Sequence, residues 1–503
     1  MQRPFPQIAL CLNPNDNVAI AKEDIAPGTS VAMPDGNALT IRESIPVGHK
    51  FALRAVETGA AVLRYGYPIG IATQAIEPGA WVHSHNLSVG DIPTESTYRV
   101  VTVPPKRPSW QSFMGYRRAE GRVGTRNYIA VIATANCAAH AATQVAHAFD
   151  RARLADFPNV DGVIPIVHTG GCSNVLGSLA YRYLQRTLAN VARNPNLGAA
   201  IAVGLGCEEN QVATCFDPAT VPGFVIQEQG GFRQTVERGV RAIQQLLPRV
   251  NACARTPQPI SELTIALQCG GSDGWSGITA NPLVGMAMDR MIEQGGTAVL
   301  SETPEIFGAE RLLLQRVANA AAGRKLIERF KWWRDQSNLL GFSVDNNPTP
   351  GNKIGGLTTI FEKSLGAVAK GGSTPLIAVY EYGEMVEHGG LVFMDSPGND
   401  PISATGQLAG GCNLIVFTTG RGSLYASNIA PCLKVASHST LYARMNDDMD
   451  FNAGKILEGV PLETAADELL RQVLAVASGE RTKGEQHGLP ETEFVPWQPG
   501  PMV

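Results

Sequence analysis

Beyond residue 110 the sequence repeats one unit, which is an apolar run, a loop with glycine or cysteine, and a helical pattern. In the first copy, apolar residues at 127–137 lead into helical periodicity over 138–154. The unit returns from 160, from 198 and from 223. Strands that alternate with helices of this length predict a parallel sheet covered by helices.

The segments on either side of these units set the domain organisation. Residues 9–103 read as short β-type runs between turn residues, which predicts a β-rich domain over 1–103. Proline-containing linkers follow at 103–110 and 251–260, so we place a first α/β domain at 104–260 and a second at 261–503. The Pro-rich end, 487–503, is expected to extend over the surface.

Length and charge limit the classes of protein that fit this sequence. A chain of 503 residues exceeds one hydrophobic core, so about two to four domains are expected. Lysine and arginine total 41 against 45 acidic residues, a net charge of −4, which argues against a nucleic-acid partner. Nine dispersed cysteines and the lack of a signal-type or membrane-spanning apolar segment favour a cytoplasmic protein without disulfides.

Two histidines end the β-rich domain in the sequence His83-Ser84-His85-Asn86. On a strand, side chains two residues apart point to one face, so His83 and His85 could bind one divalent metal. Exposed or hydrogen-bonded histidines are the alternative. His49 either approaches the same face or is an ordinary turn histidine.

Cys137, Cys172 and Cys207 each follow a predicted strand, so their thiols are expected at one edge of the sheet. Thiolates there could bind iron or an iron–sulfur cluster, or the cysteines could fill small apolar niches. Because no CxxC spacing is present, packing is the expected role for most of them. His168, close to Cys172, favours a functional loop at that position.

Glycine-rich turns at 168–172, 204–210 and 269–274 lie at the same predicted strand ends. Glycine lets the backbone approach a ligand, and helix N-termini offer N–H groups to a carboxylate. These turns suit a small acidic substrate better than a nucleotide, since neither nucleotide-binding glycine motif occurs at a strand-to-helix turn.

Charged residues stand beside these turns or in similar ones: Asp273, Glu208, Lys353 and Arg421. Together they offer the acid/base groups and the carboxylate-binding cations that removal of an α-proton requires. Each one alone could equally be a solvated turn residue.

Taken together, these segments resemble the altronate and galactarate dehydratase family over about residues 15–500. The resemblance rests on ordered blocks: 48–53, 83–86, 124–127, 204–208, 269–273, 279–282, 350–353 and 419–422. It implies an N-terminal SAF-type β domain before the catalytic α/β region, dependence on Fe(II) or another divalent ion such as Mn(II), and a homo-oligomer, with a dimer favoured.

From the blocks and the loops we assign three groups of residues. His83 and His85 are the expected metal ligands. His168, Cys172, Asp273 and Lys353 are the expected catalytic residues. The expected substrate-binding residues are His49, Arg126, Asn127, Glu208, Asn281, Asn352 and Arg421.

The implied reaction eliminates water from a 2,3-dihydroxy acid and gives a 2-keto-3-deoxy acid. The blocks 83–86 and 396–400 are similar to the altronate branch, which favours an aldonate substrate over galactarate. A lyase that releases sulfite from a short hydroxy acid is an alternative reaction, and a non-catalytic sugar-acid binding protein is an alternative outside the enzymes.

Overall fold

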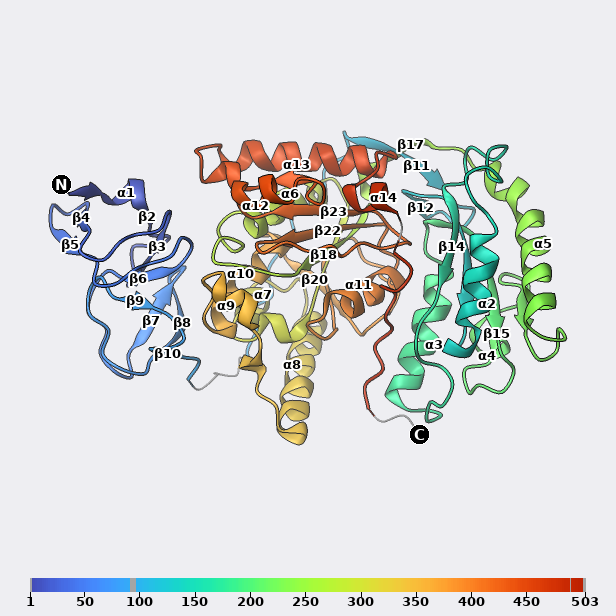
Figure 1. Cartoon of the computed structure of the whole chain (residues 1–503), viewed down its shortest axis with the longest axis horizontal. Helices are drawn as coiled ribbons and strands as arrows, with labels where there is room; N and C mark the ends of the chain where they lie inside the picture. The colour runs from blue at the N-terminus through green and yellow to red at the C-terminus, as the bar shows by residue number, and fades with distance from the viewer. Residues whose placement is uncertain (1, 91–95, 489, 501–503) are drawn as a thin grey trace.

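The computed structural model describes residues 2–90, 96–488 and 490–500. Three bodies lie side by side, with the N-terminal β domain at one end and the first α/β domain at the other (Figure 1). The second α/β domain is last in the sequence but lies between them (Figure 1). It therefore contacts both of the other domains.

The N-terminal domain consists of short strands in three small sheets, of order β2-β3-β6-β9, β1-β4-β5 and β10-β8-β7. A turn with glycine at φ 79–82° recurs at Gly28, Gly48, Gly59 and Gly79, a conformation that favours glycine. Its elements are β1 (Arg3–Pro4), α1 (Phe5–Ile8), β2 (Ala9–Leu10), β3 (Val18–Ala21), β4 (Ser30–Ala32), β5 (Ala38–Thr40), β6 (Lys50–Ala52), β7 (Ala61–Arg64), β8 (Tyr67–Ala72), β9 (Trp81–Val82) and β10 (Leu87–Ser88).

The first α/β domain contains a parallel sheet of order β14-β13-β15-β16. A small antiparallel sheet, β12-β11-β17, connects it to the rest of the chain. The elements are β11 (Ser112–Arg117), β12 (Val123–Gly124), β13 (Tyr128–Ala133), α2 (Asn136–His147), β14 (Gly162–Ile166), α3 (Leu179–Val191), β15 (Leu197–Gly204), α4 (Val212–Cys215), β16 (Gly223–Val225), α5 (Phe232–Asn251) and β17 (Thr256–Pro259).

The second α/β domain is built on a parallel seven-stranded sheet of order β20-β21-β19-β18-β22-β23-β24. Its strands are β18 (Thr264–Cys269), β19 (Thr297–Ser301), β20 (Leu376–Tyr380), β21 (Gly390–Met394), β22 (Leu414–Thr419), β23 (Cys432–Ala436) and β24 (Phe451–Asn452). Its α-helices are α6 (Ala280–Glu293), α7 (Glu310–Leu314), α8 (Ala320–Leu340), α9 (Pro350–Ile354), α10 (Ile360–Val368), α11 (Asp400–Ala409), α12 (Ser439–Arg444), α13 (Leu462–Ala477) and α14 (Lys483–His487).

The continuous apolar runs explain this architecture. Every residue of β13, β19, β21 and β22 is buried, as expected for strands covered by helices on both faces. The predicted fold class is therefore confirmed. Along the described part of the chain, no helix is long and apolar enough to cross a membrane.

The helical pattern over 308–336 is divided into α7 and α8, and Asn319 caps the second with its side chain. One local prediction differs from the structure. The described C-terminal residues do not simply follow the surface, because Phe494 and Trp497 are buried. Trp497 stacks on Trp333, which attaches this segment to the central domain.

A buried ionic cluster joins the β domain to the central domain. Glu362 of α10 forms ion pairs with Lys50 of β6 and Arg64 of β7. Lys50 also donates to the carbonyl of Gly356 at 2.6 Å, and Arg64 donates to the carbonyl of Gly274 at 2.7 Å. The β domain is thereby fixed beside the loop that follows β18.

Candidate active site

A pocket of about 360 Å³ lies between the β domain and the central domain. Its lining includes Lys22 and His49 from the β domain and Asp273, Arg421 and His438 from the central domain. The central residues follow β18, β22 and β23, so the pocket lies at the carboxyl ends of parallel strands, where ligands of open α/β sheets bind. Asp273, Arg421 and His49, predicted from separate parts of the sequence, meet here.

Asp273 is held rigidly, and one of its two oxygens carries most of the hydrogen bonds. Its Oδ1 accepts from the backbone N–H groups of Trp275 and Ser276 and from the Ser276 hydroxyl at 2.8–3.1 Å. The Ser437 hydroxyl lies 3.0 Å from Oδ1 and 3.2 Å from Oδ2. Because Oδ1 takes the other donors, Oδ2 keeps more capacity to accept a proton.

His438, which the sequence analysis missed, lies beside Asp273. It caps α12, since its Nδ1 accepts from the Leu441 N–H at 3.1 Å. The ring proton therefore belongs on Nε2, which lies 3.2 Å from the Gly420 carbonyl and 3.5 Å from Asp273 Oδ2. His438 thus donates its N–H to the Gly420 carbonyl, with the Asp273 carboxylate close to the same nitrogen.

The histidine pair of the β domain does not have the strand geometry expected for metal binding. Residues 83–86 form a turn between β9 and β10, with His83 buried and His85 exposed. Their rings pack against the Trp81 ring at centroid distances of 4.9 and 5.2 Å. The expected strand placement is wrong, because residues 83–86 form a turn, and metal binding by His83 and His85 stays a prediction.

The buried histidines act as neutral hydrogen-bonding groups that attach the β domain to α9. The pocket residue His49 accepts from Trp81 Nε1 at its Nδ1 and donates from Nε2 to the Ile354 carbonyl at 3.1 Å. His83 donates in the same way to the Lys353 carbonyl at 2.9 Å. Burial lowers the pKa of both rings, that of His83 to about 4.

The remaining predicted residues of the central domain divide into lining and structural positions. Arg421 is exposed at the pocket. Asn352 is buried in the capping box of α9 and donates to the Ser272 carbonyl at 2.8 Å. Asn281 is also buried, between the Gly366 carbonyl and the Thr418 hydroxyl. Lys353 contacts His83 through its backbone, as described above.

A buried cluster of ionisable groups that was not predicted from the sequence lies at the same sheet edge as Asp273. Cys269, Glu302 and Glu305 bring one sulfur and two carboxylate oxygens within 4.8 Å of one another, a grouping with the donor types of a metal site. Cys269 ends β18, and Glu302 directly follows β19, so both lie at the same sheet edge as Asp273. In the sequence, Glu302 stands immediately after an apolar run, and this position could have predicted a functional carboxylate at the strand end.

Glu302 is the most unusual member of this cluster. Its backbone has φ 71°, in the left-handed region that non-glycine residues rarely adopt. Both carboxylate oxygens are buried without a hydrogen-bond partner among the described residues, and Lys370 Nζ lies 3.9 Å away. Burial and the neighbouring Glu305 raise its pKa well above the usual range. Such a group departs from the rule that buried polar atoms are paired.

Lysines and a further aspartate surround the cluster. Lys363 Nζ lies 2.7 Å from Glu305 Oε1. Burial and the charge of Glu305 raise the pKa of Asp400 to about 7. A divalent cation would compensate this excess of carboxylates and give the Glu302 oxygens a partner, so these residues fit a metal better than His83 and His85 do.

The predicted residues of the first α/β domain lie in loops at the end of a different sheet. Burial lowers the pKa of His168 to about 4, and its ring nitrogens contact the Ala133 carbonyl and the Gly170 N–H. Glu208 accepts from the Thr134 hydroxyl and from backbone N–H groups of its own loop. Both side chains therefore shape the loops. Cys172 is exposed at the surface of these loops.

Arg126 and Asn127 occupy structural positions. The Arg126 guanidinium pairs with Glu485 at 2.6 Å and donates to the carbonyls of Val476 and Glu480. The Asn127 side chain bonds to Arg118 and to backbone carbonyls. These contacts give both side chains a structural role, and substrate binding by them stays a prediction.

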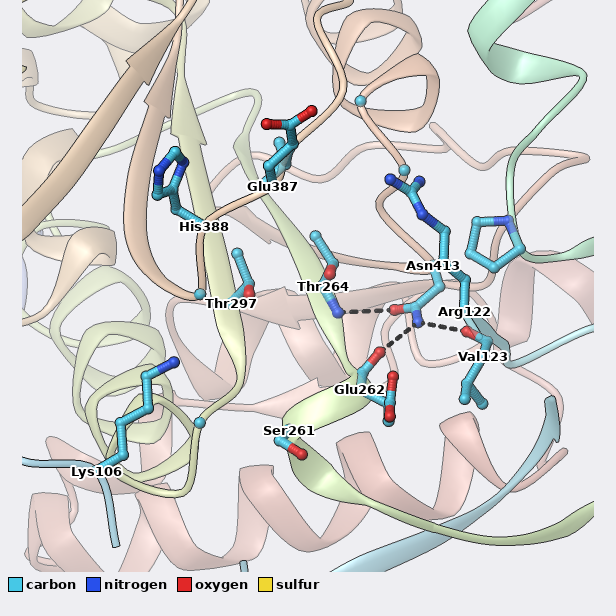
Figure 2. A pocket seen from close by; sticks show the side chains of 16 residues that line it. Lys106, Arg122, Val123, Ser261, Glu262, Thr264, Thr297, Glu387, His388 and Asn413 are labelled. Atoms are coloured by element: carbon cyan, nitrogen blue, oxygen red, sulfur yellow. Dashed lines mark hydrogen bonds between the residues drawn. The ribbon is translucent and has the colours of Figure 1, made fainter. Parts of the chain in front are cut away.

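A second polar pocket, of about 290 Å³, lies at the opposite edge of the seven-stranded sheet (Figure 2). Thr264 and Thr297, at the amino ends of β18 and β19, line it together with Asn413. The Asn413 side chain bonds to the Thr264 N–H and to the carbonyls of Val123 and Glu262 (Figure 2). This pocket contains none of the predicted residues, and it lies at the edge where ligands of such sheets rarely bind.

Comparison with known proteins covers almost the whole chain. Three family models match in order: the altronate/galactarate dehydratase SAF domain at 7–90, the D-galactarate dehydratase/altronate hydrolase second domain at 115–251, and the D-galactarate/altronate dehydratase C-terminal region at 260–502.

Full-length relatives agree with these matches. An altronate dehydratase of Escherichia coli (strain K12) is 36% identical, over 95% of this chain and 96% of the relative. One of Bacillus subtilis (strain 168) is 35% identical, over 95% and 97%. A galactarate dehydratase (L-threo-forming) of Escherichia coli is 35% identical, over 97% and 96%. The chain therefore belongs to the altronate/galactarate dehydratase family.

Proposed function

We propose that this protein is a sugar-acid dehydratase, and that the reaction takes place in the pocket between the β domain and the central domain. The observation that carries the proposal is the meeting of Asp273, His438 and Arg421 in one pocket of a chain that belongs to this family. A carboxylate base, an N–H donor and a cation are the groups that dehydration of a hydroxy acid requires.

In the proposed reaction, Arg421 binds the substrate carboxylate, since a guanidinium pairs well with that group. Asp273 removes the α-proton at Oδ2, because its Oδ1 is already occupied by backbone and serine donors. His438 donates a hydrogen bond from Nε2–H to the departing hydroxyl, which leaves as water with the proton that Asp273 has taken from the α-carbon. The product enol then tautomerises to a 2-keto-3-deoxy acid.

A divalent ion, for which Fe(II) is our first choice and Mn(II) the second, would be held by Cys269, Glu302 and Glu305. When bound, it would stabilise the negative charge that develops on the substrate carboxylate. The loop from Cys269 to Asp273 connects this cluster to the pocket. Within this loop, a Cβ added to Gly270 would lie 2.2 Å from Asp400 Oδ2, so glycine at this position lets the loop pack closely against Asp400.

An aldonate of the altronate type is our preferred substrate, and an aldarate of the galactarate type is the alternative. The resemblance of blocks 83–86 and 396–400 to the altronate branch supports this order. We also propose a cytoplasmic homodimer, on the resemblance and the composition.

The test is an anaerobic assay with added Fe(II) that measures 2-keto-3-deoxy acid from a panel of aldonates and aldarates. We expect turnover of altronate by the wild-type protein, and a kcat lowered at least about 100-fold in Asp273→Asn. Asp35→Asn, an exposed change in the β domain, is the matched control and should keep wild-type activity. No turnover of any sugar acid by the wild-type protein would overturn the function, whereas an active Asp273→Asn would overturn only the site.

A further inference from the structure

The exposed cysteines of this chain gather in one place. Cys137, Cys172 and Cys207 are exposed, whereas the other six cysteines are buried or partly buried. Cysteine is among the residue types most often found in protein interiors, so packing does not explain three exposed thiols at one sheet edge. This observation goes against the packing role expected from the sequence.

Hydrogen bonds between loops hold the three positions together. The cysteines follow β13, β14 and β15, which are neighbours in one parallel sheet. The Asn136 N–H donates to the Gly170 carbonyl at 2.9 Å, and the Glu209 N–H donates to the Cys172 carbonyl at 3.1 Å. The Cys137 and Cys172 thiols lie close enough to interact electrostatically, and this interaction raises the pKa of Cys172. The three cysteines therefore lie on neighbouring segments that are hydrogen-bonded together at one edge of the sheet.

The backbone beneath the cysteines is built for this arrangement. Gly171 has φ 94°, and a Cβ there would lie 2.3 Å from the Thr134 carbonyl, so only glycine lets the Cys172 loop pack on its neighbour. The nearby side chains of His168 and Glu208 are engaged inside the loops. The three thiols are therefore available at this surface, beside the exposed Glu209.

We propose that Cys137, Cys172 and Cys207 bind an iron–sulfur cluster that is assembled from Fe(II), Fe(III) and sulfide, with the remaining coordination position open to solvent or a small ligand. Thiolate sets of this kind select iron–sulfur clusters and other soft metals. Among the described residues, the sulfurs of the three cysteines do not all lie within 4.8 Å of one another, whereas the ligand atoms of Cys269, Glu302 and Glu305 do. A cluster suits this wider spread better than one ion does, because each thiolate binds a different iron.

This site is distinct from the pocket proposed for dehydration, and it does not depend on that proposal. The test is to purify the full chain anaerobically, reconstitute it with Fe(II), Fe(III) and sulfide, and measure iron, acid-labile sulfide and the visible sulfur-to-iron absorption. We expect iron and sulfide in equal amounts, and a loss of at least about fivefold in both in Cys137→Ser, Cys172→Ser and Cys207→Ser. Cys11→Ser and Cys253→Ser are the controls and should keep the full content.

Thermal denaturation of every variant shows whether it is folded. If a variant is unfolded, the iron and sulfide content of the wild-type protein still tests whether a cluster is bound. Iron without sulfide, zinc in place of iron, or a Cys137–Cys172 disulfide in the anaerobic protein would each overturn the cluster. Equal losses in the control variants would overturn the assignment of its ligands.

Discussion

Removal of the negative charge at Glu362 should weaken the attachment of the β domain to the central domain. This carboxylate pairs with Lys50 and Arg64, and it accepts from the N–H and hydroxyl of Thr358 at 2.8 and 2.6 Å. Burial alone would raise the pKa of Glu362, but the two cations outweigh burial and lower the pKa to about 2. Glu362→Gln would leave two buried cations without their anion.

The size of the effect follows from the pKa. A shift from 4.5 to about 2 corresponds to about 3 kcal/mol, which agrees with the 3–5 kcal/mol typical of a broken buried ion pair. Cleavage of the linker near residues 96–110 by a low concentration of protease reports how often the domains separate. We therefore expect Glu362→Gln to be cleaved about 100-fold faster. Glu57→Gln, on the exposed surface of the β domain, should be cleaved at the wild-type rate.

The pH dependence has a defined sign. Because the pKa of Glu362 is lower in the folded protein, its stabilisation is fully present above pH 4.5 and is lost as the pH falls through about 2. The difference between wild type and Glu362→Gln should shrink over this window. A triple variant, Lys50→Met, Arg64→Met and Glu362→Leu, removes all three charges and should be cleaved more slowly than Glu362→Gln. Cleavage of Glu362→Gln within about threefold of wild type would refute this reasoning.

Further predictions concern the pocket, the metal and the cysteines. Exhaustive chelation should abolish dehydration and Fe(II) or Mn(II) should restore it, since the developing enediolate loses its main stabiliser; full turnover with verified absence of metal would contradict this. Gly270→Ala should lower activity and thermal stability, because its Cβ would lie 2.2 Å from Asp400 Oδ2, and a melting temperature and kcat equal to wild type would show that the loop adapts. Cys172→Ser should reduce bound metal or turnover at least about tenfold, whereas Cys215→Ser and Cys253→Ser should not; equal mild effects at all three positions would count against a role for Cys172.

The sequence by itself determined the fold class and the edge at which function lies. Apolar runs such as 128–133 and 414–419 alternate with helical patterns, which predicts buried parallel strands, and the structure has them as such. Because the carboxyl ends of such strands share an edge, Asp273 and Arg421 could be expected together although they are distant in sequence. Local pattern was sufficient for these inferences.

Only the tertiary structure decided what each polar residue does. His83 and His85 lie in a turn, and Arg126 is neutralised by Glu485, a partner 359 positions away. Glu302 becomes a candidate ligand because folding buries it beside Cys269 and Glu305. Burial and hydrogen bonding determine the charge and the free lone pairs of a side chain, and both depend on which distant segments fold against it.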